Sequence, residues 1–518
     1  MKLTGTLLII ITALALILGG CSINQKDPKI PVPAVVPSPI ERGADINGYV
    51  INAVLDTVNK VLTAEQQVTY VNNEDLELSE LYFHVYANAF RKQETAPFLF
   101  DDFSRAYPRG FKAGYTEIAA IELSEGQNRR TLEYNLQGEG ETILRIKLLE
   151  PLQPKDSINL EFKYKVIIPP AGERFGYGDA NINMGNWYPV AAVYDDEGWN
   201  LDKYYSIGDP FYSDVSNYTV NIKAPKEYII AASGSLAEEG TENGYKSWKF
   251  HAANMRDFAF VAGDSFRVAE DKVGDTTVKS YYYKEHEKRG KEALDFGKRA
   301  IEIFNSSYGE YPYPTYSVVE TEFPSGMEYP GLVYINTMYY DDAYSVDNLM
   351  YTTVHETAHQ WWYGVVGNDQ IDEAWLDESF ATYSEGVFTE MEYGEGNGDL
   401  YYEYLEESAK EDISARTYDG VILKPLSRYE NWNDYGPAVY TGGAALLNEI
   451  RRQVGDEAFF RILQEYYDEY SFKNATTEDF LRICEQVSSK EFDDLFHEYL
   501  SSVKYEECVA FFNRESRV

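Results

Sequence analysis

The sequence predicts a multidomain α+β protein in which a β-rich region over residues 45–272 precedes a mainly α-helical region over 273–518. The length of 518 residues suffices for about two to four domains. Apolar and polar side chains alternate in the first region, as in 81–86 and 218–222, which is typical of half-buried strands. The second region shows helical periodicity, beginning with an amphipathic stretch over 285–304.

The N-terminus carries a targeting signal rather than part of the fold. Lys2 precedes an apolar run that is long enough for a signal peptide and short for a membrane-spanning helix. The run ends in Leu-Gly-Gly-Cys21, which resembles a bacterial lipobox, so we expect a signal peptide over 1–20 and a lipid on Cys21. The alternatives are an ordinary signal peptide, or an uncleaved anchor, with a cysteine there by chance. Frequent prolines predict an extended tether over 21–44, and hence a lipid-anchored, extracytoplasmic protein at the bacterial cell membrane.

The composition limits the classes of partner that the protein is expected to bind. The formal net charge of −39 and a pI near 4.5 argue against nucleic acid and against anionic membranes bound through basic patches. Solubility is the simplest explanation of this charge, and attraction of a cationic peptide end is the second. Only Cys484 and Cys508 follow Cys21, which does not make a disulfide framework, and whether they pair stays open.

The residues His355-Glu356-Thr357-Ala358-His359 predict a catalytic zinc site with one ion per chain. Two histidines four residues apart on a helix project from one face and can reach the same ion. Glu378 is the natural third ligand, which leaves a fourth position open for water. Glu356 lies next to the first ligand, where a carboxylate can take a proton from that water. Two surface histidines on an ordinary helix are the alternative.

Two helices are expected to build this site. The first is predicted from Ser345, as its N-cap, to Gly364, as its C-cap. Asp372 is the predicted cap of the second, which carries Glu378. An antiparallel pair of helices would bring Glu378 over the histidines. Further helices are expected near 456–470, 476–488 and 491–502, and strands over 316–320 and 332–335.

The segment 375–381, Trp-Leu-Asp-Glu-Ser-Phe-Ala, resembles the W-L-N-E-G-F-A of the M1 family of zinc aminopeptidases. The resemblance implies a thermolysin-like zinc peptidase domain over 273–518 and the family's β-domain over 45–272. It also implies zinc ligation by His355, His359 and Glu378. Asp377 and Ser379 replace the family's Asn and Gly; as neighbours of a ligand they concern the surroundings of the metal rather than ligation.

A second motif concerns the substrate. Ser325-Gly326-Met327-Glu328-Tyr329 resembles the family's G-x-M-E-N, with Ser325 and Tyr329 in place of Gly and Asn. Small residues let a substrate backbone approach an exposed strand edge, so we expect Gly326 and Met327 to bind substrate. Glu328 offers a carboxylate to a free α-ammonium group. A Gly-Pro turn with a solvated glutamate is the alternative.

A third motif concerns the developing charge of the reaction. Tyr440-x-x-Gly443-Ala444 resembles the family's Y-x-K-G-A, with Gly442 in place of Lys. The resemblance implies that Tyr440 stabilises the oxyanion, because a phenol donates a hydrogen bond without adding charge. Tyr435 is a secondary substrate-binding candidate. The family's Q-x-E-P stretch is not found; 186–190 is a candidate for its place.

These features together predict a zinc aminopeptidase that releases N-terminal residues from peptides with a free N-terminus at the outer face of the membrane. A zinc endopeptidase with the same chemistry is one alternative, since it does not need Glu328. A non-catalytic surface lipoprotein on a peptidase fold is another, and epoxide hydrolysis beside peptidase activity, known in a few relatives, is a weaker third. The preferred N-terminal side chain and the oligomeric state stay open.

Overall fold

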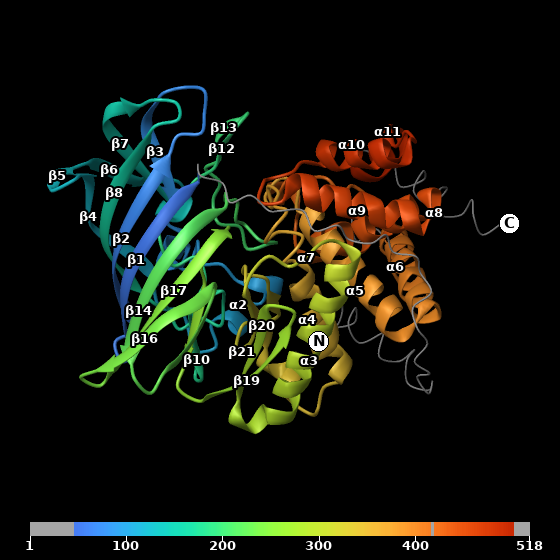
Figure 1. Cartoon of the computed structure of the whole chain (residues 1–518), viewed down its shortest axis with the longest axis horizontal. Helices are drawn as coiled ribbons and strands as arrows, with labels where there is room; N and C mark the ends of the chain where they lie inside the picture. The colour runs from blue at the N-terminus through green and yellow to red at the C-terminus, as the bar shows by residue number, and fades with distance from the viewer. Residues whose placement is uncertain (1–45, 416–418, 502–518) are drawn as a thin grey trace.

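The computed structural model describes residues 46–415 and 419–501 (Figure 1). The predicted signal peptide, Cys21, the tether over 21–44 and Cys508 lie outside the described residues. Within the described ranges, no helix combines the length and the apolar character that crossing a membrane requires. Cys484 lies buried in helix α10 (Thr477–Ser488) and forms no disulfide among the described residues.

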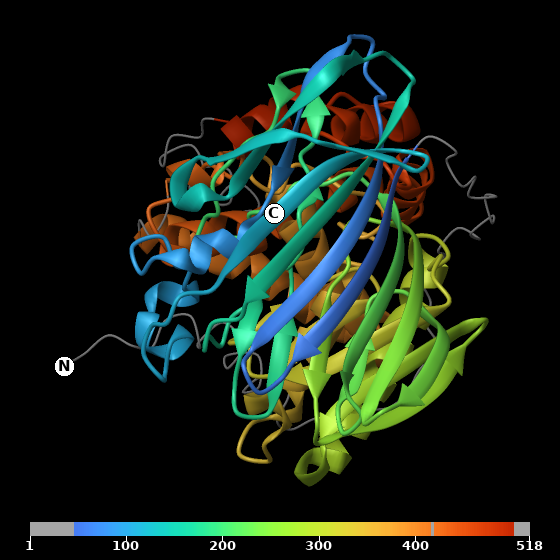
Figure 2. The same ribbon diagram turned by 90° about the vertical axis from the view of Figure 1, so that its left-hand side faces the viewer.

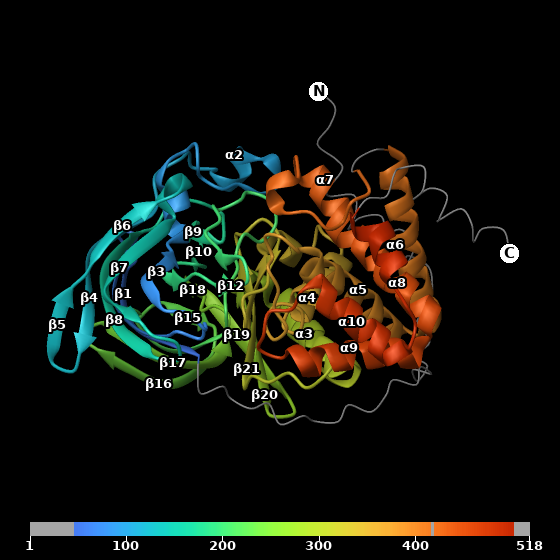
Figure 3. The same cartoon turned by 90° about the horizontal axis from the view of Figure 1, so that it is seen from above.

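The first half of the chain is built on one large, strongly curved sheet, which forms the outer layer of the molecule (Figures 2 and 3). Its exposure pattern alternates along the strands, as the sequence predicts for half-buried strands, because successive side chains point to opposite faces. Within this sheet β1 and β14 pair in parallel, and the other neighbouring strands pair antiparallel. In sheet order the strands are β16 (Ser235–Glu242), β17 (Tyr245–Met255), β14 (Ser216–Pro225), β1 (Asn47–Asp56), β2 (Val61–Val71), β8 (Ser157–Ile167), β4 (Tyr115–Glu125) and β5 (Asn128–Thr131).

Two smaller sheets line the concave side of the large sheet, between it and the helical half (Figure 3). The first consists of β11 (Val190–Ala191), β3 (Leu78–His84), β7 (Ile143–Leu152) and β6 (Glu133–Gln137), and the second of β15 (Ile229–Ala232), β18 (Phe260–Gly263), β10 (Asn181–Met184) and β9 (Phe175–Tyr177). A two-stranded ribbon joins β12 (Tyr194–Asp195) and β13 (Gly198–Trp199). Short helical turns follow β3, and among them α2 (Phe103–Ala106) extends toward the helical half.

A five-stranded mixed sheet begins the second half. Its order is β19 (Phe266–Val273), β20 (Thr276–Tyr283), β21 (Thr315–Thr321), β23 (Leu332–Asn336) and β22 (Gly326–Met327). β21 and β23 confirm the two predicted strands, and β22 carries the Gly-Met of the substrate motif at the sheet edge. β19 spans the predicted domain boundary at 272/273, which stays a prediction.

Helices make up the rest and confirm the α+β class (Figure 1). They bury several large aromatic side chains, among them Trp361, Trp362 and Trp375, which are 0–1% exposed. The helices are α3 (Glu287–Ser307), α4 (Val346–Ala358), α5 (Trp375–Tyr393), α6 (Glu395–Ala415), α7 (Trp432–Gly436), α8 (Gly443–Val454), α9 (Asp456–Tyr470), α10 (Thr477–Ser488) and α11 (Asp493–Phe496).

Two predicted helix ends are wrong. Ser345 does cap α4, its side chain accepting the amide of Asp347 at 3.2 Å, but α4 ends at Ala358 rather than near Gly364. Buried Arg256 donates to the carbonyls of Tyr363 and Val365, which holds this backbone out of the helix. Tyr363 accordingly has φ +128°.

The predicted start of α5 is also wrong. Asp372 does not cap this helix, which begins at Trp375 with Ala374 as its N-cap. The side chain of Asp369 instead accepts the amides of Ile371 and Asp372 at 2.8 and 3.2 Å, so the backbone here forms a turn.

Candidate metal centre and substrate cleft

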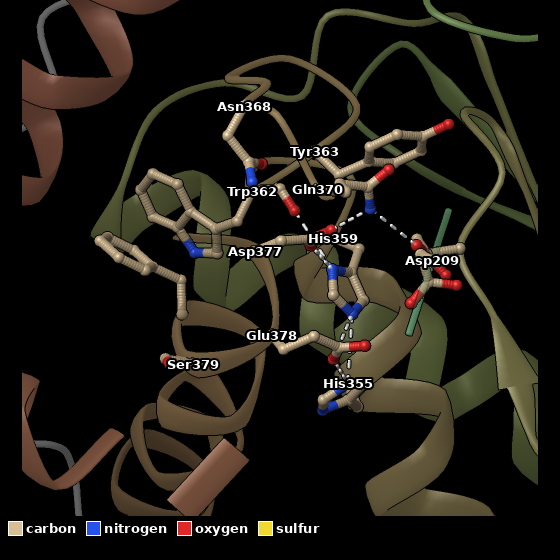
Figure 4. A network of polar contacts seen from close by, with 12 residues as sticks. Asp209, His355, His359, Trp362, Tyr363, Asn368, Gln370, Asp377, Glu378 and Ser379 are labelled. Carbon is tan, nitrogen blue, oxygen red and sulfur yellow. Dashed lines mark hydrogen bonds and ion pairs between the residues drawn. The ribbon is translucent and has the colours of Figure 1, made fainter. Parts of the chain in front are cut away.

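The three predicted zinc ligands converge at the contact between α4 and α5 (Figure 4). His355 and His359 project from the same face of the end of α4, and Glu378 lies one turn into α5. Glu378 Oε2 is 3.1 Å from His355 Nε2 and 3.5 Å from His359 Nε2, and the two imidazole nitrogens are 3.1 Å apart. All three side chains are largely buried.

These spacings fit one zinc ion. Ligand atoms 2.0–2.2 Å from an ion at tetrahedral angles lie about 3.3–3.6 Å from one another. The three observed spacings of 3.1, 3.1 and 3.5 Å are close to that triangle. Two imidazoles and one carboxylate are also the donor set of catalytic rather than structural zinc, because they leave one position open. His355, His359 and Glu378 would hold the ion.

Carboxylates orient both imidazoles. The Nδ1 of His355 is 2.9 Å from Glu385 Oε1, and Tyr401 donates to the other oxygen of Glu385 at 2.8 Å. The Nδ1 of His359 contacts the carboxylate of Asp377 and lies 3.2 Å from the carbonyl of Trp362. An Nδ1–H donated to a carboxylate leaves Nε2 free as the ligand and increases its basicity.

Asp377 thus has a definite place: the residue that departs from the family's Asn lies against a ligand, where Gln370 donates a hydrogen bond to it. Sequence reasoning missed Glu385. The signal was available, because Glu385 follows Glu378 by two helical turns and therefore shares its face of α5.

Glu356 lies beside the ligands. Its carboxylate, that of Glu328 and an imidazole nitrogen of His359 all lie within 4.8 Å of one another. A Cβ built on Gly326 would come within 2.0 Å of Glu356 Oε1, so only glycine lets the edge strand pass this close. Burial raises the pKa of Glu356 to about 8, against the opposing effect of His355 and His359. This position and proton affinity suit a group that accepts a proton from water.

Glu328 points into the same space. It is 3% exposed, and burial together with the nearby carboxylate of Asp209 raises its pKa well above the ordinary range. Gln370 donates to Glu328 Oε1 at 3.4 Å. A buried, electron-rich pair of carboxylates next to a metal site is a suitable environment for a cationic group such as an ammonium ion.

Asp209 is a cleft residue that sequence reasoning did not find. It follows Gly208 in the segment between β13 and β14, is 6% exposed, and forms an ion pair with the buried Arg174. No motif marks it, because its neighbours in the cleft come from distant parts of the chain. The segment 186–190 does not line the cleft. Its Asn186 instead accepts a hydrogen bond from Tyr329 at 2.9 Å, beneath the edge strand.

Tyr440 and Tyr435 lie on the opposite wall. Tyr440 belongs to a π-helical turn over Pro437–Gly442 and donates to Glu378 Oε1 at 2.6 Å. Single π turns of this kind are frequent at functional sites. Tyr435 is fully buried, with its ring 6.0 Å from that of Tyr440 and its hydroxyl close to Gly208. Tyr440 therefore faces the cleft, and Tyr435 packs behind it.

The cleft that contains these groups encloses about 290 Å³. Residues of both halves of the chain line it: Leu99, Phe100, Arg105, Arg174 and Asp209 come from the first half. The second half contributes the edge strand with Gly326 and Glu328, the two zinc helices, and parts of α6 and α7. Met327 points the other way, is fully buried, and its sulfur lies 2.9 Å from Arg174 Nε. Of the two predicted contacts on this strand, Gly326 is the one that faces the cleft.

Comparison with known proteins agrees with this geometry. Residues 292–499 match the peptidase family M1 domain. The chain is 27% identical over 298 residues to Aminopeptidase N of Lactobacillus delbrueckii subsp. lactis and 24% identical over 311 residues to Probable aminopeptidase 2 of Sulfurisphaera tokodaii. These matches cover 54% and 56% of this chain but only 34% and 38% of the relatives, so the chain spans little more than a third of their length.

Solved structures show the same fold over nearly the whole chain. An M1 zinc metallopeptidase from Deinococcus radiodurans superposes with a TM-score of 0.58 at 17% identity, covering 91% of this chain and 96% of that one. A variant of that enzyme bound to a Tyr-Ser-Ala substrate has a TM-score of 0.57. The family match, the relatives and the geometry of the metal centre agree, so residues 292–499 are a peptidase family M1 domain.

Proposed function

We propose that the chain is a zinc-dependent aminopeptidase that releases single residues from peptides with a free N-terminus. The observation that carries this proposal is the position of Glu328: a buried carboxylate directly after the edge strand β22, within 4.8 Å of both Glu356 and His359. An ammonium group held there lies one residue from the bond that meets the metal. The two relatives named above are an aminopeptidase N and a probable aminopeptidase, which supports the same assignment.

Each residue then has a chemical task. Bound zinc supplies a Lewis acid that polarises the scissile carbonyl and acidifies water. Glu356 accepts a proton from the attacking water and delivers it to the leaving amine. Tyr440 turns its hydroxyl from Glu378 toward the oxygen on which negative charge develops. Glu328, with Asp209 beside it, holds the α-ammonium group and so sets which bond is cleaved.

The second part of the proposal is location. The apolar run that ends at Cys21 supports a lipid-anchored protein at the outer face of a bacterial cell membrane, tethered by the proline-rich stretch over 21–44. The tether would leave the folded part of the chain, with its substrate cleft, accessible to peptides outside the cell.

The decisive experiment compares a free peptide with its N-acetylated form. We expect the purified chain to release N-terminal residues one at a time from the free peptide and to lose this activity with a zinc chelator. The acetylated peptide should be cleaved far more slowly, because it has no charge for Glu328. Equal cleavage of both peptides, or internal cuts, would establish the endopeptidase alternative instead.

A further inference from the structure

The substrate cleft is lined by groups of both charges. Asp209, Glu328 and Glu356 gather their carboxylates at one end, around the proposed ammonium site. Two arginines line the cleft as well. Arg174 is neutralised by its ion pair with Asp209, in which both side chains are at least 92% buried. Arg105 is the other.

Arg105 has no such partner. It lies on α2 and is half-buried, and it forms no direct ion pair among the described residues, although its charge interacts with the nearby carboxylates of Asp102 and Glu173. Its Nη2 donates to the carbonyl of Pro324 at 2.6 Å, and its guanidinium carbon is 5.5 Å from the ring centroid of Phe100. One edge of the guanidinium is therefore fixed, and the remaining N–H groups are available. An arginine at a cleft wall that makes no direct ion pair with a described carboxylate can bind an anionic group of a substrate.

The position of Arg105 along the strand indicates which anion it meets. Gly326 lies on the edge strand beside Glu356, and Glu328 follows that strand at the proposed ammonium site. A substrate with its N-terminus at Glu328 that pairs with this edge therefore runs antiparallel to it. Its C-terminus then points toward Pro324. Pro324 lies in the bend two residues before Gly326, and two residues span at most about 7 Å, so the second residue after the scissile bond can reach this part of the wall. In a tripeptide, that residue carries the terminal carboxylate.

We propose that Arg105 binds the C-terminal carboxylate of tripeptide substrates, which makes this chain selective for short peptides with both ends free. The inference rests on the proposed aminopeptidase function and deepens it. The guanidinium fork matches a carboxylate, and the fixed contact with Pro324 orients it in advance. The carboxylates around Glu328 and the guanidinium of Arg105 thus complement the two charges of a zwitterionic tripeptide.

The test compares kcat/KM for a tripeptide with a free C-terminus and for the same tripeptide as its C-terminal amide. Wild type should prefer the acid by about tenfold to hundredfold, as expected for a charge-assisted contact. Arg105→Gln should reduce the acid-to-amide ratio to about 1, and Arg105→Lys should restore part of it. Arg109→Gln is the matched control, because Arg109 follows on the same segment, pairs with Asp179 and does not line the cleft. It should leave the ratio unchanged.

Several results would overturn the inference. A wild-type ratio near 1 contradicts it, as does an equal loss of activity on acid and amide in Arg105→Gln, which would make Arg105 only a support for the strand. A larger ratio for dipeptides than for tripeptides contradicts the tripeptide register. An amino acid anilide, which has no carboxylate, distinguishes failure of the proposed function from failure of the Arg105 proposal. If wild type does not hydrolyse the anilide, the proposed aminopeptidase function is wrong. If wild type hydrolyses the anilide but does not prefer the tripeptide acid over its amide, only the role of Arg105 is refuted.

Discussion

Replacing Asp377 by Asn should loosen zinc binding without removing a ligand. Asp377 is 1% exposed, and its carboxylate contacts Nδ1 of His359 while Gln370 donates to it. The amide cannot serve both neighbours equally, because one of its two polar atoms is a donor and faces either Nδ1–H or the Gln370 amide. Gln370 also donates to Glu328 at 3.4 Å, so its reorientation would disturb the ammonium site too.

The magnitude follows from the partner that is lost. Removing a carboxylate that orients a histidine ligand typically weakens metal affinity by about 10- to 100-fold, or about 1.4–2.7 kcal/mol. Competition with a chromophoric chelator measures the zinc dissociation constant directly, independent of turnover. Asp372→Asn is the control, because Asp372 is exposed and precedes α5 without contacting a ligand. Asp372→Asn should bind zinc as tightly as wild type. If Asp377→Asn also binds zinc within twofold of wild type, the carboxylate of Asp377 does not orient His359 and our reasoning is refuted.

Four further predictions concern single residues. Glu356→Gln should retain zinc by metal analysis yet lose about 10²–10⁴-fold in turnover, because only the proton acceptor is removed; activity above a few percent would contradict this. Glu328→Ala should lower kcat/KM for free peptides by about 10- to 150-fold while N-acetylated peptides are unaffected, which narrows the gap between them. Cys21→Ala should abolish lipid labelling and release the protein from the membrane fraction, and a soluble, unlipidated wild-type protein in the native host would refute the anchor. Buried Glu173 has an oxygen without a partner among the described residues, and burial raises its pKa to about 7 from the ordinary 4.5. The contribution of protonated Glu173 to the free energy of unfolding is complete below pH 4.5 and is lost as the pH rises through 7. In urea unfolding, Glu173→Gln should therefore be about 3 kcal/mol more stable than wild type at pH 8 and equally stable at pH 4.

Local patterns in the sequence determined much of the fold. Alternation identified the strands, and Ser345 identified the start of the first zinc helix, because both depend on neighbours within a few residues. The ends that were misplaced, at Ala358 and Trp375, depend on distant groups. Arg256, which lies 107 residues before Tyr363 in the sequence, donates to the carbonyls of Tyr363 and Val365 and so keeps this backbone from continuing α4.

The same division holds for the site. His355, His359 and Glu378 could be found in the sequence because zinc ligation imposes a short, regular spacing on one helix and its neighbour. Asp209 and Arg105 could not, since each lies more than one hundred residues before the zinc helices and acquires its role only where the β-rich half closes against them. A sequence motif reveals residues whose chemistry requires a fixed spacing along the chain, as for the zinc ligands. The positions of Asp209 and Arg105 in the cleft depend instead on the packing of distant segments, so only the tertiary structure decides them.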